Sequence, residues 1–478
     1  MNTEASSAAL AVDLGATSGR TVLATYDGSR IAMRELTRFD NPQIPAAGHL
    51  FWDLPHLYRE VLRALTLVAQ EGIQLSSIGI DTWGCDFACF GADGQLLGMP
   101  YCYRDAHTDD AMPRFFAEVM PAQEVYARTG IQFMPFNSLF QLHTLRREGS
   151  SALEAAARVL FIPDALIYML TGEAVCEYTV ATTSQMVNAA TGDLDEKLLQ
   201  AVGLRRSQMG RLVQPGERVG VLTEQVQAAT GVGAVPVVAV GSHDTASAVA
   251  AVPAADDRFA YLSCGTWSLL GVETKAPVVN AATQAENFTN EGGILGTTRF
   301  LKNITGLWLL EQSRREWTHG EVPADINALN AMALQSTCQS IINPDDARFA
   351  HPHSMLAAIR DYLDETRQPL PQSAADYIRV IFRSLAHRYA EVIATLRRLT
   401  DVDIQRLHVI GGGSRNAYLM QFAADATGLT VVAGPQEGTA LGNVLMQLRA
   451  QRRVDTLTDM RAIVARSVDL CTYTPGNK

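Results

Sequence analysis

A segment rich in glycine and hydroxyl groups, residues 13–20 (DLGATSGR), has the composition of a phosphate-binding turn. Its glycines let several backbone N–H groups point at one spot, and such a concave nest binds phosphate oxygens. Asp13 ends the preceding strand-like run, where its carboxylate could hold a magnesium ion through water. The alternative is an ordinary glycine hairpin with a solvated aspartate.

Two later turns have features that suit a nucleotide. Residues 264–268 (CGTWS) repeat the strand–turn–strand pattern, and Thr266 can donate from both its hydroxyl and its N–H. The glycines at 411–413 leave bare backbone beside which an adenine or ribose could lie, although such turns also let helices pack closely. A dinucleotide fingerprint is not supported because Asn416 replaces its last glycine, and the chain has no Gly-Lys dipeptide for a Walker-type loop.

A carboxylate follows the apolar run at residues 235–240, in the segment SHDTA, and precedes a helix of small residues. At a helix N-terminus the backbone N–H groups and the helix dipole favour the ionised form of Asp244, which lowers its basicity. Phosphoryl transfer passes through a loose transition state, so Asp244 would need only to orient an alcohol and accept its proton late. The alternative is that Asp244 or Thr245 is only a helix cap.

Polar residues in the first half of the chain carry the donors and acceptors that a polyhydroxylated ligand needs. A glycine beside Trp83 would let such a ligand approach the backbone. Each residue by itself would equally suit a surface or supporting role. The set is Gly84, Asp86, Arg104, Asp105, Asn137 and Gln141.

The elements that must position these residues form one pattern that occurs twice. Three strand-like runs come first, then a helix over residues 54–71, then a strand, a bend at Gly84 and another strand. The second half again opens with a strand, a turn and a strand. The repeat predicts an α/β fold of two duplicated domains, residues 1–245 and 246–478, with an active-site cleft between them.

In the second half, a long amphipathic helix is expected over residues 374–399, followed by the strand RLHVI. Ser414 is expected to cap the next helix, and Gly428 to end it before a further strand.

The composition excludes several classes of protein. The 39 basic and 50 acidic residues give a net charge of −11, and Lys and Arg form no stripe, so neither nucleic acid nor an anionic membrane is an expected partner. No apolar run approaches the ~20 residues that span a bilayer. The N-terminus lacks the basic region of a secretory signal. We expect a cytoplasmic protein that acts on small molecules, as a monomer or small homo-oligomer.

The seven cysteines are scattered along the chain without a C-x-x-C pair, so neither a disulfide framework nor a structural zinc site is expected. Cys85 and Cys89 lie in an apolar run and are expected to be buried as small hydrophobic residues. His351 and His353 have no third ligand at a suitable spacing, which disfavours a metal site there.

Together these segments resemble the FGGY carbohydrate kinases, which share the duplicated ribonuclease-H-like fold of actin and hexokinase. The resemblance covers nearly the whole chain, from AVDLGATSGR to the helix that begins GTALGN. It implies an enzyme that phosphorylates a sugar with ATP and Mg²⁺. The segments that carry it are GIDTWGCDF, YRDAHT, TGIQFMPFN, EYTVATTSQMVN, VGSHDTASAV, YLSCGTWSLLG, NFTNEGG and LKNITGLWLLE.

The resemblance also implies roles for single residues, with Asp244 as the catalytic base and Asp13 beside the metal. The ATP phosphates would be bound by Ala16, Thr17, Ser18, Gly19 and Arg20, and the rest of the nucleotide by Thr266, Glu311 and Gly413. The sugar would contact Gly84, His243, Asp244 and Thr245, with Asn303 near it. Glu311 departs from the family, which usually has Gln there, and a carboxylate near phosphates repels them unless a cation intervenes.

Other functions remain open on the sequence alone. A sugar-sensing or chaperone-like ATPase could use the same fold without phosphorylating a sugar. A two-metal nuclease could use Asp13, Asp81 and Asp244 as ligands, although the net negative charge argues against it. Among sugar kinases, fuculose and xylulose kinases are alternatives.

Overall fold

The computed structural model describes residues 7–317, 322–323, 325–350 and 352–476, which form two compact units. Each unit contains strands of a mixed β-sheet covered by helices, so the predicted α/β class is confirmed. The domain limits 1–245 and 246–478, and the cleft between the domains, stay predictions. Unit 1 comprises Met1–Ala251, Thr274–Phe300 and Thr439–Ser467, and unit 2 comprises Val252–Glu273, Leu301–Gly438 and Val468–Lys478.

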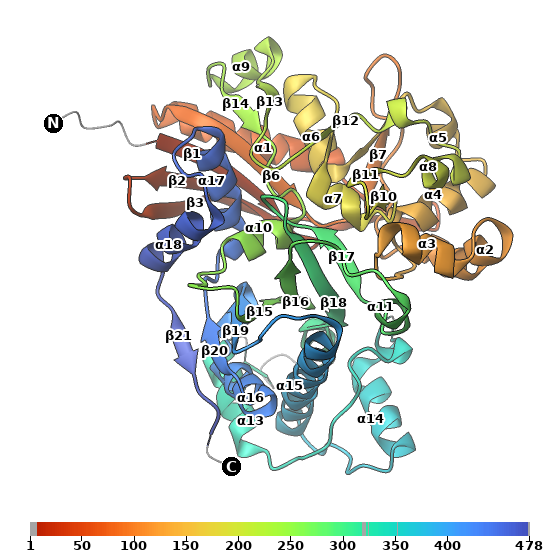
Figure 1. Cartoon of the computed structure of the whole chain (residues 1–478), viewed down its shortest axis with the longest axis vertical. Coiled ribbons are helices and arrows are strands. Elements are labelled where there is room, and N and C mark those ends of the chain that lie inside the picture. The colour runs from red at the N-terminus through yellow and green to blue at the C-terminus, as the bar shows by residue number, and fades with distance from the viewer. Residues whose placement is uncertain (1–6, 318–321, 324, 351, 477–478) are drawn as a thin grey trace. The chain divides into compact units, whose positions relative to one another are not determined.

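The sheet of unit 1 has six strands in the order β13-β14-β6-β1-β2-β3 (Figure 1). β1 is antiparallel to β2 and parallel to β6, so a hairpin is joined to a parallel α/β arrangement. The strands are β1 (Ser7–Leu14), β2 (Ser18–Tyr26), β3 (Ile31–Asp40), β6 (Leu75–Thr82), β13 (Arg218–Val221) and β14 (Pro236–Val238).

The two faces of this sheet differ because side chains alternate along each strand. Leu10, Val12 and Ile80 point to an apolar core that includes the buried side of helix α1 (Leu54–Gln70). The opposite face carries Ser77, Gly79 and Asp81, and there Ser77 and Asp81 hydrogen-bond to side chains of α17 (Gly438–Ala450). The alternating residues therefore give this sheet one apolar face and one polar face.

Helix α1 confirms the predicted helix over residues 54–71 to within one residue. Asp53 accepts a hydrogen bond from the N–H of His56 and caps the start, and Gly72, with φ of +69°, follows the end. A short hairpin before α1, β4 (Gln43–Ala46) and β5 (His49–Trp52), was not predicted. Its turn at Ala47 and Gly48 has positive φ at both residues, which suits a tight hairpin but lacks an Asn-Gly or Asp-Gly signal.

Between β6 and β13, unit 1 contains a second hydrophobic cluster that periodicity in the sequence did not delimit. β7 and β8 pair antiparallel within it, and Cys85 and Cys89 are buried as expected. Further elements of unit 1 outside its main sheet are β7 (Phe87–Phe90), α2 (Ala111–Glu118), α3 (Ala122–Thr129), α4 (Ser138–Arg147), α5 (Ser151–Ala155), β8 (Arg158–Phe161), α6 (Ile162–Thr171), β9 (Val175–Glu177), α7 (Tyr178–Thr183), β10 (Val187–Asn188), β11 (Asp193–Leu194), α8 (Glu196–Ala201), β12 (Arg211–Val213), α9 (Glu224–Thr230), α10 (Asp244–Ala250), α11 (Ala281–Ala285) and α18 (Leu457–Ser467).

The second sheet has the order β17-β18-β16-β15-β19-β20-β21. Here β15 is antiparallel to β16 and parallel to β19, which repeats the pairing of β1 with β2 and β6 and confirms the predicted repeat. Its strands are β15 (Phe259–Cys264), β16 (Trp267–Thr274), β17 (Thr289–Gly292), β18 (Thr298–Thr305), β19 (Arg406–Ile410), β20 (Thr430–Ala433) and β21 (Cys471–Tyr473).

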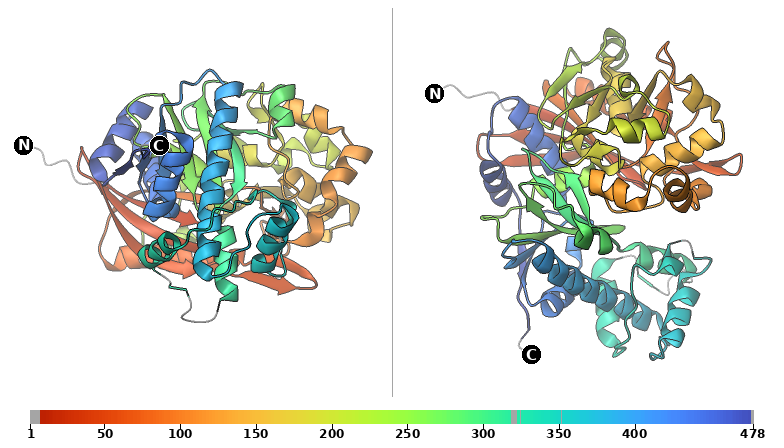
Figure 2. Two further views of the ribbon diagram at one scale, coloured as in Figure 1. Left: turned by 90° about the horizontal axis from the view of Figure 1, so that it is seen from below. Right: turned by 45° about the vertical axis from the view of Figure 1, so that its right-hand side comes forward.

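The long helix of unit 2, α15 (Ala374–Leu399), has the predicted limits and packs along α16 (Ala417–Thr427) (Figure 2). Gly428, in the left-handed region, ends α16 as predicted. The expectation that Ser414 caps α16 is wrong, because a 3₁₀ turn at Gly412–Arg415 delays the helix and Asn416 accepts from the N–H of Leu419 instead. The other helices of the unit are α12 (Trp308–Glu316), α13 (Ile326–Gln335) and α14 (Met355–Glu365).

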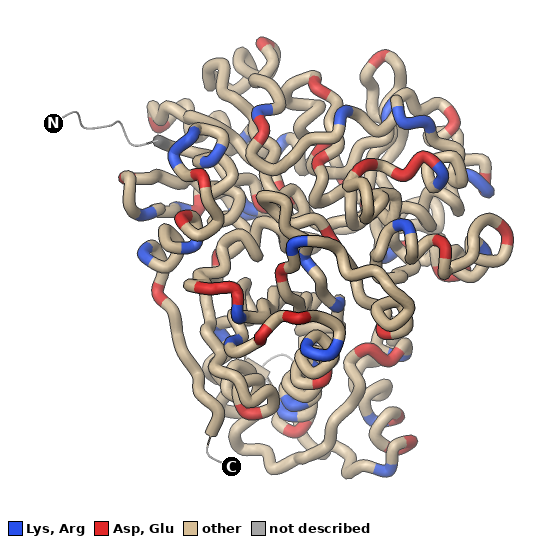
Figure 3. The backbone as a smooth tube through the Cα atoms, viewed as in Figure 1, with Lys and Arg blue, Asp and Glu red and all other residues tan. Residues whose placement is uncertain are grey.

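Basic and acidic residues are scattered in short stretches along a backbone that is mostly uncharged (Figure 3). Among the helices that the structure describes, none is both long enough and apolar enough to cross a bilayer.

Candidate functional site

The turn between β1 and β2 lies where the sequence predicted it. The N–H of Gly15 donates to the carbonyl of Ser18 at 2.9 Å, and Asn41 Nδ2 donates to the carbonyl of Gly15 at 3.0 Å, so the turn is held from both sides. A Cβ at Gly19 would lie 2.4 Å from the ring of Phe39, so close packing against this ring requires glycine at position 19. Phosphate binding by residues 16–20 stays a prediction.

Asp13 forms an ion pair with Arg20, its partner in the β1–β2 register. Both Nε and Nη2 of Arg20 donate to Asp13 Oδ2, at 2.9 and 2.6 Å. Two residues that the sequence predicted to bind a metal and phosphate are thereby brought together as an ion pair.

Asp81 lies next to Asp13 in the register of β6 against β1 and is fully buried. Asn443 Nδ2 donates to Asp81 Oδ2 at 2.6 Å, while Oδ1 has no hydrogen-bond partner among the described residues. Burial, and then the charges of Asp13 and Asp244, raise the pKa of Asp81 well above its ordinary value. From the sequence, Asp81 was expected only as a ligand of a nuclease. Asp13 and Asp81 each follow a β-branched residue at the end of a strand, and this repeated pattern could have placed them side by side.

These carboxylates fit a magnesium ion of the kind held mainly by phosphates and water. Mg²⁺ is usually bound through one or two carboxylates and keeps several waters. Among the described residues no group of three or more Asp, Glu, His or Cys side chains could hold a metal by itself. The unpartnered Asp81 Oδ1 and the mutual repulsion of the acids, which raises the pKa of Asp81, would both be relieved by a cation. His351, named above for a disfavoured metal site, lies outside the described residues.

Asp244 is the first residue of α10, and His243 occupies the cap position without a side-chain cap bond. Thr245 Oγ1 donates to Asp244 Oδ1 at 3.0 Å, and His243 Nε2 lies 3.5 Å from the same oxygen. The side chain keeps 33% of its surface accessible. Among the described residues, Oδ2 therefore has no protein hydrogen bond and can meet a ligand.

The pKa of Asp244 corrects one expectation. The helix N-terminus was expected to lower its basicity, but burial raises the pKa of this carboxyl, and the charge of Asp13 adds to the increase. His243 and Thr245 act in the opposite direction without cancelling it. Asp244 is therefore a stronger base than an exposed aspartate.

The backbone before Asp244 is held by a buried glutamate that the sequence analysis missed. Glu177 Oε2 accepts from the N–H of Ser242 at 3.2 Å and from Thr179 Oγ1 at 2.6 Å. Thr179 Oγ1 in turn accepts from the N–H of His243 at 3.1 Å. This short network fixes the two residues that precede the candidate base.

Burial raises the pKa of Glu177 from its ordinary 4.5 to about 7. Because the pKa of Glu177 is higher in the folded than in the unfolded protein, this carboxyl group stabilises the fold fully at a pH below its unfolded-state pKa. That stabilisation is lost as the pH rises through about 7. A glutamine side chain does not ionise, so the Glu177→Gln variant should not lose stability in this way. We expect the unfolding free energy of the variant minus that of the wild type to increase by up to about 3 kcal/mol between about pH 5 and about pH 8. Urea unfolding across this range measures it. A pH-independent difference between the two proteins would contradict the prediction.

Most of the polar residues predicted in the first half of the chain form hydrogen bonds within the protein. Asp86 is buried and accepts from both indole N–H groups of Trp52 and Trp83, at 2.6 and 2.9 Å, and from Gln141 Nε2 at 2.9 Å. Burial raises the pKa of Asp86 to about 6. These contacts give Asp86 and Gln141 a supporting role.

Asp105 and Asn137 are also bound within the protein. Asp105 accepts from the N–H groups of Leu50 and His107, and Asn137 Nδ2 donates to Gln185 Oε1 at 2.9 Å. Arg104 lies over the ring of Tyr103, its guanidinium carbon 5.0 Å from the ring centroid. A Cβ at Gly84 would lie 2.8 Å from Thr183 Oγ1, so packing against α7 also requires this glycine. Sugar contact by Gly84 stays a prediction.

In unit 2, two residues predicted to bind nucleotide lie together. Thr266 Oγ1 donates to Glu311 Oε1 at 3.5 Å, in the turn closed by the Gly265 N–H bond to the carbonyl of Trp267. A Cβ at Gly413 would lie 2.3 Å from Cys264 Sγ, so the glycine turn packs directly on the end of β15. Asn303 is half-buried on β18. Nucleotide contacts by Thr266, Glu311 and Gly413, and the place of Asn303 near substrate, stay predictions.

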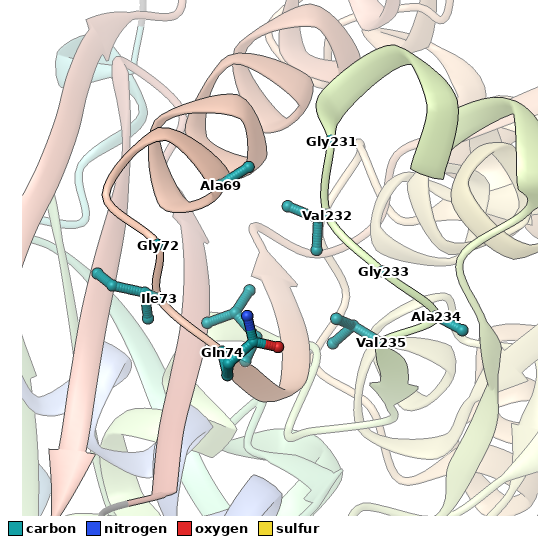
Figure 4. A pocket seen from close by; sticks show the side chains of 10 residues that line it. Ala69, Gly72, Ile73, Gln74, Gly231, Val232, Gly233, Ala234 and Val235 are labelled. Atoms are coloured by element: carbon teal, nitrogen blue, oxygen red, sulfur yellow. The ribbon is translucent and has the colours of Figure 1, made fainter.

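A small pocket of about 180 Å³ in unit 1 is separate from these residues (Figure 4). It is lined by the end of α1, by residues 72–75, which lead into β6, and by residues 231–235, which follow α9. Asp81 lies near the other end of the same strand, about 20 Å away at ~3.3 Å per residue. The pocket lining has no charged side chain.

Two family models match most of this chain. Residues 8–251 match the N-terminal domain of the FGGY family of carbohydrate kinases, and residues 260–451 match its C-terminal domain. A curated relative, named rhamnulokinase, from Bacteroides thetaiotaomicron is 54% identical over 465 residues, covering 97% of this chain and 95% of its own.

Solved structures support the same fold. A ligand-bound xylulose kinase from Lactobacillus acidophilus superposes with a TM-score of 0.79 at 16% identity, covering 98% of this chain and 94% of that one. A glycerol kinase from Plasmodium falciparum with ADP has a TM-score of 0.77 at 15% identity, with coverage of 98% and 94%. The two-domain α/β fold is thus confirmed, and the chain belongs to the FGGY family of carbohydrate kinases.

Proposed function

We propose that this protein transfers the γ-phosphoryl group of ATP to the C1 hydroxyl of L-rhamnulose, giving L-rhamnulose 1-phosphate and ADP in the breakdown of L-rhamnose. The observation that carries the choice of sugar is the 54% identity, over 97% of the chain, to a relative named rhamnulokinase. The reaction would take place in the cytoplasm.

Asp244 is the base in this proposal. Its Oδ1 is engaged by Thr245 and faced by His243, so Oδ2 is the atom that accepts the proton of the C1 hydroxyl. The hydroxyl oxygen forms the new bond to the γ-phosphorus while the bond from that phosphorus to the β-phosphate bridging oxygen breaks. The raised pKa of Asp244 makes proton acceptance easier.

The remaining residues bind and orient. Ala16, Thr17, Ser18, Gly19 and Arg20 would contact the phosphates, and Thr266, Glu311 and Gly413 the rest of the nucleotide. Gly84, His243 and Thr245 would contact the sugar, with Asn303 nearby. Mg²⁺, when bound near Asp13 and Asp81, would neutralise charge on the β- and γ-phosphates. In this scheme residues 1–245 bind sugar and phosphate, and residues 246–478 bind nucleotide.

A coupled assay of ADP release across a panel of ketoses tests this function. We expect ADP release that depends on L-rhamnulose, with a kcat/KM at least about tenfold above those for L-fuculose and D-xylulose, a difference of about 1.4 kcal/mol in transition-state binding. A higher value for either of these sugars would reassign the substrate within the family. ADP release that no sugar increases would instead favour a sugar-sensing ATPase.

A further inference from the structure

Arg299 is a fully buried cation next to the residues that precede α10. It lies on β18, and its Nε donates to the carbonyl of Gly292 at 2.8 Å. Its Nη1 is 3.1 Å from Glu291 Oε2, and this ion pair offsets the cost of burying either charge. Its Nη2 lies 3.1 Å from Nδ1 of His243. All of these residues belong to unit 1.

The contact with His243 determines where the imidazole proton lies. A guanidinium has only donors and stays protonated, so Nδ1 of His243 must accept from Arg299. In the neutral ring the proton is then on Nε2. Nε2 is the nitrogen 3.5 Å from Asp244 Oδ1, so an N–H group faces the carboxylate.

A competing arrangement is available in the same cluster. Glu291 Oε2 lies 3.2 Å from Nδ1 of His243 and would accept a hydrogen bond from a protonated Nδ1 if no donor occupied that nitrogen. A neutral ring protonated on Nδ1 would turn the lone pair of Nε2 toward Asp244, and two acceptors would then face each other. Arg299 prevents this because it occupies Nδ1 as a donor and binds Glu291 at the same time.

We infer that Arg299 is a positioning residue, which fixes the Nε2–H tautomer of His243 and through it the orientation of the Asp244 carboxylate. Together with the Thr245 hydroxyl, His243 restrains Oδ1 and leaves Oδ2 toward the sugar. The effect on catalysis rests on the proposed role of Asp244 as base; the tautomer itself does not.

The tautomer is measured directly by NMR. Selective ¹⁵N labelling of the ten histidines, with His243 assigned by the signal lost in His243→Gln, reports whether Nδ1 is protonated. In the wild type without substrate we expect an unprotonated Nδ1. In Arg299→Met, Glu291 is left as the neighbour of Nδ1, and we expect this nitrogen to become protonated. A protonated Nδ1 in the wild type, or an unchanged ring in Arg299→Met, would overturn the inference.

Kinetics supply a second readout. Loss of a hydrogen bond to a charged group corresponds to a change of about 10- to 100-fold in an equilibrium or rate constant. We therefore expect kcat of Arg299→Met to fall by about 10- to 100-fold, with a smaller change in the KM for sugar. Arg299→Lys keeps a cation beside Glu291 but lacks a second nitrogen to reach His243. It therefore tests the same contact if Arg299→Met does not fold. We expect a protonated Nδ1 of His243 and a decrease in kcat of about tenfold in this variant. A wild-type kcat with an unchanged Nδ1 signal in Arg299→Lys would contradict the inference.

Arg34→Met is the matched control, because Arg34 is an exposed arginine that pairs with Glu71 on the surface. We expect it to leave both the His243 signals and kcat unchanged. A failure of the proposed function can be told apart from a failure of this inference. If the function is wrong, the wild-type protein releases no sugar-dependent ADP, while the NMR measurement still reports the tautomer of His243. If another sugar is the substrate, kcat is compared on that sugar.

Discussion

Replacing Asp244 with asparagine is expected to lower kcat for sugar phosphorylation by at least about a hundredfold while the protein folds normally. A positioned base contributes about 10²- to 10⁴-fold, and an amide of the same shape cannot accept the proton of the sugar hydroxyl. The asparagine oxygen can still accept from Thr245 Oγ1, so the start of α10 keeps its local hydrogen bond. The ADP assay measures the loss.

The stability of this variant separates chemistry from folding. Burial and Asp13 raise the pKa of Asp244, so its ionised form costs stability at neutral pH, and neutral asparagine should unfold at an equal or higher temperature. Asp109→Asn, a change at an exposed aspartate, is the control and should keep wild-type activity. Near-normal turnover of Asp244→Asn would remove this residue from the mechanism.

Gly442→Ala is expected to have the largest effect on folding. Gly442 lies within α17, and a Cβ there would be 1.7 Å from the carbonyl oxygen of Ser247 and 2.4 Å from its carbon. Both atoms are backbone of α10, the helix that begins at Asp244, so no side chain can rotate away. Alanine normally stabilises a helix by about 1 kcal/mol relative to glycine, but overpacking of a tight interior costs about 1–3 kcal/mol or more.

We therefore expect Gly442→Ala to lower the free energy of unfolding by at least about 2 kcal/mol and to reduce kcat, because α10 must shift to admit the methyl group. Urea unfolding and the ADP assay measure the two effects. Gly233→Ala is the control, since a Cβ there meets no atom within 4 Å. A variant at Gly442 as stable as wild type would mean that α17 and α10 do not pack as described.

Local sequence signals identified many of the elements. The apolar spacing of α1, the long amphipathic pattern of α15 and the glycine after α16 each act within one helix, and each was located to within a residue or two. The hairpin of β4 and β5 was missed because its turn is specified by backbone conformation at Ala47 and Gly48 and not by a strong turn dipeptide. The cap at Ser414 was wrong because a 3₁₀ turn competes with the helix start.

The amino-acid sequence by itself determined the α/β class, the repeat, the family likeness and the positions of Asp13 and Asp244 at the ends of their predicted elements, because all of these depend on residue types and short spacings. Only the tertiary structure decided that Asp81 lies beside Asp13, that Glu177 holds the backbone before His243, and that Arg299 reaches His243 from a strand 56 residues later in the chain. It also reversed the expected direction of the Asp244 pKa. The reason is physical: burial and the charges of distant residues act through space, and no local pattern in the chain encodes which of them meet.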